Sequence, residues 1–472
     1  MIVRDEDESA TLRGRLARMR ERAARDVPPL ELRRAHLATL EQIVRGHGAS
    51  IARAIAADFA RSTHETDLLE LFPTLEAARY ARRNLADWLK PQRVPIAPYF
   101  WPARARVIRR PLGVVGIIAA WNYPLLLTFG PLIGALAAGN AALLKMSELT
   151  PHTNELLARL TADAFATDHV AIVSGGARTG KAFAALPFDH LLFTGSTETG
   201  RSVMRAAAGN LTPVTLELGG KSPAIVGLDA AVGVAAARIM SGKCRNAGQT
   251  CIAPDYVLLP EGATDAFIAA ARGYVAARYP NLRTTRDYTG IVNDAHFARL
   301  TDLLADAAQK GASVVALHAH FDRPDPATRR MPPAIVTGVR DDMRIAHEEI
   351  FGPILAARTY RTLDEAIAYV NDRPSPLAVY YFGTAAADIA RVLERTTSGG
   401  ACINDVMLQF PQDALPFGGV GPSGMGAYHG RAGFETFSHR KAVFEQAKVS
   451  GFALLEPPYG RRFRAILRIL RR

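Results

Sequence analysis

The stretch Val114-Val115-Gly116-Ile117-Ile118 opens the part of the chain that decides the fold. This short apolar run is typical of a strand that is buried on both faces of a sheet. Helical and strand-like patterns alternate after it. They predict helices at residues 131–139, 151–166 and 199–208, and strands at residues 141–145, 170–173 and 190–194. The alternation predicts an α/β fold with a Rossmann-like, doubly wound parallel sheet.

The chain on both sides of this segment completes the predicted architecture. Because 472 residues exceed one ordinary core, we expect two or three domains. A second α/β domain follows residue 251, with strands at 256–259 and 313–317 and helices at 264–278, 297–310 and 363–371. Toward the N-terminus we expect helices at 10–25, 31–58 and 66–89, then an extended edge hairpin at 93–110. Residues 414–426 are rich in Gly and Pro and predict a loop.

Composition narrows the class of protein. The three cysteines are few and odd in number, so they form no disulfide framework. They also lack the paired short spacing of a zinc site, so we expect no metal. An acidic N-terminus without an apolar stretch predicts no signal peptide and therefore a cytoplasmic protein. The net charge of +12 fits a solvated basic surface, because no groove-reading motif points to nucleic acid.

Three segments carry chemistry that local sequence leaves ambiguous. One segment closes a strand and opens a helix: Phe193-Thr194-Gly195-Ser196-Thr197-Glu198-Thr199-Gly200. It is either a turn that binds a phosphate at the helix N-terminus or an ordinary strand-to-helix turn. Lys145 and Glu148 follow the preceding strand and suit ribose hydroxyls or form a solvated turn. In Trp121-Asn122-Tyr123-Pro124, the Asn amide can donate to an oxyanion or simply hold a turn.

A cysteine and a carboxylate are the most reactive pair. Cys251 ends Asn246-Ala247-Gly248-Gln249-Thr250-Cys251, and alone it would be a buried small hydrophobe. Glu217 lies between two leucines in Leu216-Glu217-Leu218-Gly219-Gly220-Lys221. We expect burial to raise the pKa of Glu217, and a thiolate at Cys251 requires a lowered pKa.

Taken together, these segments resemble the aldehyde dehydrogenase family, from about residue 109 to residue 443. The six ordered motifs are the turn at Gly195, the Asn122 segment, the Glu217 and Cys251 segments, Glu348-Glu349-Ile350-Phe351-Gly352-Pro353 and Leu415-Pro416-Phe417-Gly418-Gly419. Segments such as Pro422-Ser423-Gly424-Met425-Gly426-Ala427-Tyr428-His429-Gly430 are similar to the class 3 branch, and within it to bacterial coniferyl-aldehyde dehydrogenases.

The resemblance implies a reaction and a set of site residues. Cys251 would attack the aldehyde, Asn122 would hold the oxyanion, and Glu217 would activate the water that hydrolyses the thioester. NAD, or NADP, would be the cofactor. The implied cofactor-binding residues are Trp121, Lys145, Glu148, Gly195, Ser196, Thr197, Gly200, Glu349 and Phe351. Glu148 would repel a 2′-phosphate, which favours NAD.

The resemblance also implies domains and partners. Residues 1–92 and 111–218 would bind NAD(P), residues 219–418 would form the catalytic domain, and residues 93–110 and 430–446 would form a small β element that makes a homodimer. Two departures affect the substrate assignment: Met146 replaces the family's usual proline, and Gln409 replaces a histidine frequent in class 3. Tyr256, Phe410 and Phe417 suit an aromatic channel for hydroxycinnamyl or other aromatic aldehydes, and medium-to-long-chain aliphatic aldehydes remain open.

Two alternatives to a hydrolytic enzyme stay open at this level. In a CoA-acylating relative, the acyl group of the thioester passes to CoA. The other alternative is a binding or structural protein that has the same fold and no catalytic activity. The intact Cys251, Glu217 and Asn122 argue against both. The basic tail, residues 447–472, ends in an amphipathic segment with Phe463, Ile466, Leu467 and Leu470 on one face. It predicts either peripheral contact with the inner membrane face or docking on the protein.

Overall fold

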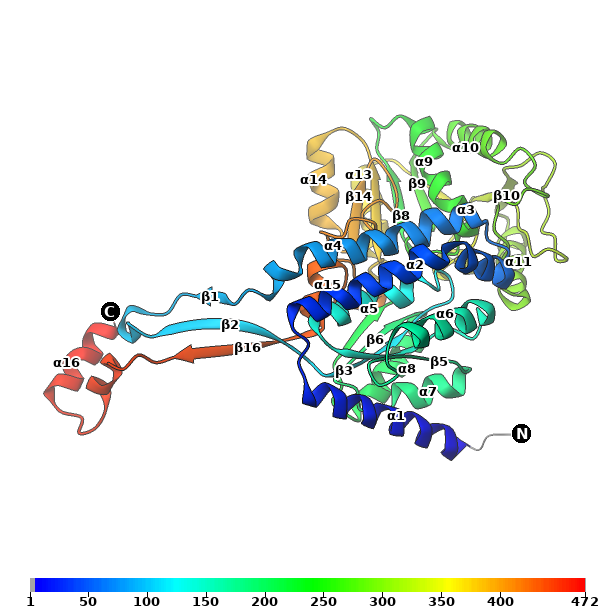
Figure 1. The fold of residues 1–472 in the computed structure, drawn as a ribbon. Coiled ribbons are helices and arrows are strands. Elements are labelled where there is room, and N and C mark those ends of the chain that lie inside the picture. Colours follow the sequence, from blue (N-terminus) through cyan, green and yellow to red (C-terminus); the bar gives the residue numbers. More distant parts are fainter. Residues whose placement is uncertain (1–4, 472) are drawn as a thin grey trace.

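The computed structural model describes residues 5–471 and arranges them as a two-sheet body with a long arm (Figure 1). The predicted segments that reach residues 1–4 and 472 extend outside the described residues. The body contains a six-stranded and a seven-stranded sheet, and a three-stranded sheet forms the arm. The α/β fold with a Rossmann-like sheet is confirmed.

The six-stranded sheet has the order β15-β7-β6-β3-β4-β5. Its strands are β3 (Val114–Ile118), β4 (Ala141–Lys145), β5 (Val170–Val173), β6 (His190–Thr194), β7 (Val214–Glu217) and β15 (Gly424–Met425). Only β15 runs antiparallel to its neighbour. Helices α5 (Leu126–Ala138), α6 (Pro151–Ala164), α7 (Ala177–Ala184) and α8 (Thr197–Ala208) connect the parallel strands. Since Ile118 pairs with Lys145 and Thr194 with Glu217, the carboxyl ends of four strands share one edge.

The seven-stranded sheet has the order β10-β11-β12-β9-β8-β13-β14. Its strands are β8 (Pro223–Val226), β9 (Tyr256–Pro260), β10 (Ser313–Ala316), β11 (Ala334–Thr337), β12 (Ile354–Tyr360), β13 (Ala378–Phe382) and β14 (Gly400–Ile403). Its helices are α9 (Val232–Cys244), α10 (Thr264–Arg278), α11 (Asp294–Gln309), α12 (Arg344–His347), α13 (Leu363–Asn371) and α14 (Ala386–Arg395). Only β10 is antiparallel, so this sheet is also wound from βα units.

The N-terminal helices cover the six-stranded sheet. Helices α1 (Asp5–Arg25), α2 (Leu30–Phe59) and α4 (Phe72–Leu89) lie where the sequence predicts helices. Helices α2 and α4 run side by side and pack on α5 (Figure 1). The predicted single helix at 66–89 is wrong at its start, because α3 (Thr63–Thr66) passes into a π-helical segment, η1 (Asp67–Leu71), before α4. A π-helical turn of this kind frequently accompanies a functional site.

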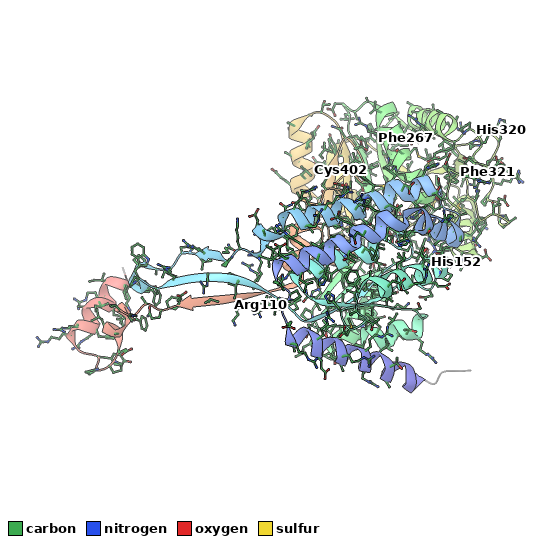
Figure 2. All side chains as sticks on the ribbon, in the orientation of Figure 1. Arg110, His152, Phe267, His320, Phe321 and Cys402 are labelled. Atoms are coloured by element: carbon green, nitrogen blue, oxygen red, sulfur yellow. The ribbon has the colours of Figure 1, made fainter. Side chains whose placement is uncertain are left out.

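The arm consists of β1 (Gln92–Val94), β2 (Arg104–Pro111) and β16 (Ser438–Glu445). The predicted hairpin forms, but it is not an edge of a body sheet, because β16 pairs along the whole of β2. Arg110 marks the place where the arm meets the body (Figure 2). The tip holds η2 (Pro98–Phe100), η5 (Gly451–Leu455) and the predicted tail helix, α16 (Arg461–Leu470).

Short elements close the C-terminal part of the body. The predicted loop at 414–426 is wrong in part, since it contains η4 (Gly421–Ser423) and strand β15. Helix α15 (Gly430–Thr436) then packs on α5 and α4 before the chain enters the arm. Among the helices of residues 5–471, none is both long and apolar enough to cross a bilayer.

Candidate active site

Cys251 follows a tight turn, η3 (Arg245–Gly248), at the end of α9. Asn246, Ala247 and Gly248 all have positive φ angles, of 49°, 50° and 73°. Two of these are not glycine, and strained backbone of this kind is held in place by its surroundings and gathers at functional sites. Gly248 packs against the Gly352 carbonyl so closely that a side chain would collide with it. The turn therefore joins the cysteine motif to the Glu349 motif.

Glu217 ends β7 at the shared edge of the six-stranded sheet. Its side chain is 3% exposed, and neither carboxylate oxygen has a hydrogen-bond partner among the described residues. Burial raises the pKa of Glu217 well above its ordinary value, which confirms the direction predicted from its leucine neighbours. A buried carboxylate that nothing stabilises is a strong proton acceptor once it is ionised.

The thiol of Cys251 is partly buried, and its surroundings raise its pKa to about 12. Burial is the largest cause, and the negative charges of Glu349 and Glu217 add to it. The lowered pKa that a resting thiolate would require is not found in this structure, because burial and both acids raise the pKa of the thiol. The same interaction places Cys251 within electrostatic range of Glu217, the group that could take its proton.

Asn122 lies in the turn after β3, beside the Cys251 segment. Its Nδ2 donates to the Gln249 carbonyl at 3.1 Å, and the Asn246 side chain donates to the Asn122 carbonyl at 3.1 Å. Because an amide carries two hydrogens, the second hydrogen of Asn122 stays available for another acceptor. The Tyr123 and Thr250 hydroxyls lie 2.6 Å apart and join the two segments again.

The sequence interpretation missed a buried ion pair that holds this arrangement. Arg61 pairs with Glu70 of η1, and both side chains are fully buried. Arg61 also donates to the Asn122 carbonyl and, at 3.1 Å, to Asn246 Oδ1. Glu70 accepts from the backbone N–H groups of Leu125 and Leu126 at 2.8 and 3.1 Å. One sequence signal was present: Glu70 stands between leucines, as Glu217 does.

Glu349 approaches the cysteine from the second sheet. Its carboxylate rests against Gly219, where any side chain would overlap it. Burial raises its pKa to about 7, with Asp255 adding to the rise, while the Gly220 N–H and Lys221 oppose it. Arg299 fixes this segment by donating to the carbonyls of Glu349 and Ile350 at 3.1 and 2.6 Å.

Except for Glu349 and Phe351, which precede β12 of the seven-stranded sheet, the predicted cofactor residues lie along the carboxyl edge of the six-stranded sheet. Ser196 caps α8 through Thr199 N–H, and Thr197 donates to the Pro422 carbonyl at 3.1 Å. The Gly195 N–H donates to the Glu217 carbonyl at 3.0 Å, so the turn adjoins the proposed base. Gly200 is buried and lies against Leu218, where its lack of a side chain lets α8 approach.

The remaining cofactor residues form two pairs. Lys145 Nζ donates to Glu148 at 2.9 Å at the end of β4. The rings of Trp121 and Phe351 meet edge to face, with centroids 5.5 Å apart. A helix N-terminus, a lysine–acid pair and an aromatic pair around one sheet edge fit the phosphates, ribose and ring of a dinucleotide.

Met146 and Gln409, the two residues that depart from the family pattern, are both held by the protein interior. Met146 is buried, at 1% exposure, and packs in the core. Gln409 Nε2 donates to the Tyr380 hydroxyl at 3.5 Å, and its Oε1 is buried without a partner in the described part of the chain. Phe410 and Phe417 meet edge to face at 4.7 Å, whereas Tyr256 pairs with Tyr369. Of the predicted aromatic trio, Phe410 and Phe417 therefore form a ring pair, and the ring partner of Tyr256 is Tyr369.

Comparison with known proteins gives a consistent result. The profile of the Aldehyde dehydrogenase family matches residues 12–443. The chain is 49% identical to a probable coniferyl aldehyde dehydrogenase of Pseudomonas aeruginosa, over 94% of this chain and 93% of that protein. It is 43% identical to mouse aldehyde dehydrogenase family 3 member A2, over 88% and 84% of the two chains.

Solved structures agree with the sequence relatives. Staphylococcus aureus AldH in its substrate-bound state superposes with a TM-score of 0.92 at 37% identity, over 97% of this chain and 99% of that chain. An NAD-dependent aldehyde dehydrogenase of Sinorhizobium meliloti has a TM-score of 0.84 at 28% identity, over 93% and 88%. An NADP-dependent enzyme of E. coli has a TM-score of 0.83 at 25% identity, over 93% and 91%.

Proposed function

The chain belongs to the aldehyde dehydrogenase family and is an NAD(P)-dependent aldehyde dehydrogenase, and we propose that Cys251, Glu217 and Asn122 perform its reaction on an aromatic aldehyde. The observation that carries this proposal is the buried Glu217 carboxylate, which has no hydrogen-bond partner among residues 5–471 and acts electrostatically on the Cys251 thiol. It supplies a base where hydrolysis of a thioester needs one.

The first half of the reaction uses all three residues. Glu217 accepts the thiol proton of Cys251, and the sulfur attacks the aldehyde carbon. The free hydrogen of the Asn122 amide and the Cys251 backbone N–H then donate to the oxygen, which becomes negative. Arg61 and Asn246 keep Asn122 in place through its carbonyl. A bound nicotinamide supplies the hydride acceptor, and a thioester on Cys251 results.

The second half depends on Glu217. The thiol proton that Glu217 accepted must first pass to solvent. The carboxylate then takes a proton from water as the water oxygen bonds to the thioester carbon, and the sulfur leaves with the electron pair of the C–S bond. The carboxylic acid departs and Cys251 is restored. A CoA-acylating enzyme has no need of such a base, so Glu217 favours water over CoA as the acceptor.

The cofactor residues follow the geometry of the sheet edge. Gly195, Ser196 and Thr197 would hold the pyrophosphate at the N-terminus of α8, with Gly200 allowing the close approach of this helix. Lys145 and Glu148 would hold the adenine ribose. Glu349 would hold the nicotinamide ribose beside Phe351 and Trp121. Because Glu148 carries a negative charge at this point, NAD is the preferred form.

Two observations support an aromatic substrate. Several relatives are named coniferyl aldehyde dehydrogenases, including the Pseudomonas aeruginosa protein. Phe410 packs against the apolar cluster of Ala119, Tyr123, Leu126 and Leu127 beside the Asn122 turn, and Phe417 packs on Phe410. We infer that a hydroxycinnamyl aldehyde fits this wall better than a short aliphatic aldehyde.

A panel of aldehydes tests the substrate. The kcat/KM for coniferyl aldehyde with NAD should exceed that for acetaldehyde by at least about tenfold, since the aromatic ring buries more apolar area. A medium-chain aldehyde such as decanal is the control for apolar area alone. Equal values for coniferyl aldehyde and acetaldehyde would contradict the aromatic preference. NADH formation that requires CoA would contradict the hydrolytic route.

We further propose the domain division and a homodimer. The segments 1–92 and 111–218 would form the NAD(P)-binding domain, 219–418 the catalytic domain, and 93–110 with 430–446 the dimer element. Strand β14 is an edge strand of the seven-stranded sheet, and the arm extends away from its own body (Figure 1). Each therefore offers unpaired backbone groups to a second copy of the chain. Light scattering should give twice the mass of the chain.

The basic tail is proposed to touch an anionic membrane from the cytoplasm. Helix α16 presents Arg461, Arg462, Arg464 and Arg468, while Ile469 is 72% exposed. Phe463 also packs on Tyr459, a contact within the tail itself. Deletion of residues 460–472 should abolish co-sedimentation with phosphatidylserine vesicles and leave neutral vesicles unbound. No change on deletion would exclude the membrane role.

A further inference from the structure

Cys251 lies in a tight turn that is anchored on both sides. The Ala253 N–H donates to the Thr250 carbonyl at 3.0 Å, so Cys251 and Ile252 are the two central residues of a β-turn. The hydrogen bonds from the turn after β3 hold the entry side of this β-turn. On its exit side, the hydroxyl of Tyr380 donates to the Ile252 carbonyl at 2.5 Å. The reaction proposed above gives this second anchor no role.

Tyr380 is a rigid anchor because it lies inside the seven-stranded sheet. It belongs to β13, where it pairs with Ala224 of β8 on one side and with Cys402 of β14 on the other. Cys402 is labelled in Figure 2 and marks this part of the sheet. Tyr380 is fully buried, and a buried tyrosine hydroxyl usually has a hydrogen-bond partner. Since strands lie on both sides of Tyr380, it has little freedom to follow a movement of the turn.

Gln409 supports Tyr380 from the segment after β14. Its Nε2 donates to the Tyr380 hydroxyl oxygen at 3.5 Å, and the same hydroxyl donates its own hydrogen to Ile252. A hydroxyl can rotate about its C–O bond, so a donor on one side of the oxygen favours a hydrogen that points to the other side. Hydrogen bonds therefore connect Gln409, through Tyr380, to the residue that follows Cys251.

The ability of the Cys251 sulfur to carry negative charge depends on the shape of the turn. Burial is the largest cause of the raised pKa of the thiol, and Glu349 and Glu217 add to the rise. Hydrogen bonds from the backbone N–H groups of Cys251 and Ile252 to the thiol oppose this rise. Both N–H groups belong to the turn, and hydrogen bonds strengthen when the acceptor becomes charged. The turn must therefore keep its geometry for the sulfur to become a thiolate.

We propose that Tyr380 is a positioning residue for Cys251, because its hydroxyl holds Ile252 so that the Ile252 N–H stays directed at the sulfur. This role rests on the proposed function of Cys251 as the nucleophile. The sulfur becomes negative when its proton leaves, and again when it departs from the thioester carbon. Tyr380 acts only through the turn and exchanges no proton of its own.

Tyr380→Phe is the direct test, because it removes the hydroxyl and keeps the buried ring. Iodoacetamide reacts with the thiolate, so the pH dependence of alkylation reports how readily the sulfur becomes negative. The reaction can be followed on the Cys251 peptide by mass spectrometry. We expect alkylation at pH 8 to be about 3- to 10-fold slower than in the wild type, since one hydrogen bond is lost.

The pH dependence separates a positioning role from a merely structural one. In Tyr380→Phe, the rise of the alkylation rate with pH should move to higher pH, because the thiolate loses part of its support. The rate of the NADH burst should fall by a similar factor. A loss of stability alone would leave the pH at which folded protein is alkylated unchanged. A wild-type alkylation rate and pH dependence in Tyr380→Phe would overturn the proposal.

Tyr381→Phe is the matched control. Tyr381 is the next residue of β13 and is also buried, but neighbouring residues of a strand face opposite sides of the sheet. Its hydroxyl lies against Gly227 and has no hydrogen-bond partner among residues 5–471. We expect wild-type alkylation and a wild-type NADH burst. Equal slowing in Tyr381→Phe and Tyr380→Phe would also count against the proposal.

Alkylation requires no turnover, so this test is separate from a test of the proposed function. If Cys251→Ser still formed NADH at the wild-type rate, Cys251 would not be the nucleophile, whatever the result for Tyr380. If Cys251→Ser is inactive and Tyr380→Phe is alkylated normally, the nucleophile is correct and only the positioning role fails.

Gln409→Leu tests the same hydrogen bonds at a position that is only half-buried. It should slow alkylation of Cys251 in the same direction by about twofold, because the Tyr380 hydroxyl remains but loses one donor. Gln412→Leu is its control, since Gln412 is exposed and donates to the Leu408 carbonyl at 3.3 Å. If Tyr380→Phe does not fold, as judged by circular dichroism, this second pair decides. Equal alkylation rates in Gln409→Leu and Gln412→Leu would then overturn the proposal.

Discussion

Glu70 and Glu217 are both buried glutamates, at 0% and 3% exposure, and they differ in their partners. Glu70 has the guanidinium of Arg61 and two backbone N–H groups. Glu217 has no hydrogen-bond partner within residues 5–471. One region of the molecule thus surrounds its carboxylate with donors, and the other leaves its carboxylate without any.

The pKa values show what this difference does. Burial raises the pKa of both carboxyl groups. Only for Glu70 do a nearby cation and hydrogen bonds oppose the rise. A carboxylate held by donors is a fixed structural charge, and its partners position Asn122. A carboxylate without donors exchanges protons readily, which suits a general base.

Removing the charge of Glu217 should give the largest effect. We expect Glu217→Gln to lower kcat by about 10² to 10⁴-fold, because the hydrolytic water loses its base. The acyl-enzyme on Cys251 should accumulate and be visible by intact-protein mass spectrometry. The variant should fold normally, since no hydrogen bond is lost. If Glu217→Gln turned over at the wild-type rate, Glu217 would not be the base, and it would not differ in function from Glu70.

Removing the charge of Glu70 should act on stability first. Glu70→Gln leaves the Arg61 guanidinium buried without a counter-charge, which costs about 3–5 kcal/mol. Urea denaturation followed by circular dichroism measures this loss. Asp364→Asn is the control, because Asp364 pairs with Arg391 and Arg395 at the surface, where such pairs contribute about 1 kcal/mol or less. Equal losses in the two variants would show that the buried pair is not structural.

The sequence could predict those features that depend on one continuous segment. Helices such as α10 and α13 match their predicted bounds because each complete amphipathic pattern lies within one segment. Glu217 and Cys251 were identifiable because their motifs are continuous in sequence. The raised pKa of Glu217 also followed from its adjacent leucines.

What sequence could not give depends on contacts between distant segments. Arg61 meets Asn246, 185 positions away, so its role is invisible in either segment alone. The two-residue strand β15 exists only because β7 pairs with it. The raised pKa of Cys251 is not visible in its own segment, since it follows from burial and from acids in β7 and in the segment before β12.

Asn122 connects the two regions and can separate their effects. Its carbonyl accepts from Arg61, while its side-chain amide points to the Cys251 segment. We expect Asn122→Ala to lower kcat by about 10² to 10³-fold through loss of the oxyanion donor. Stability should change less than in Glu70→Gln, because the backbone carbonyl remains. Asn122→Asp, which keeps the shape without a donor, should be equally impaired; a fully active Asp variant would argue against oxyanion stabilisation.

The smallest expected effect is a dependence of stability on pH. The folded pKa of Glu217 lies well above its ordinary value of 4.5, so above that pH the unfolded chain releases a proton that the folded chain keeps. Wild-type stability therefore falls, relative to Glu217→Gln, as pH rises from 5 through neutrality toward the folded pKa. Urea midpoints of the two proteins at pH 5 and pH 8 measure this change. We expect the Gln variant to gain on the wild type at pH 8, the opposite of the loss expected for Glu70→Gln. A difference that does not vary with pH would mean that Glu217 is ionised in the folded protein as readily as in water, and the two buried glutamates would then be alike.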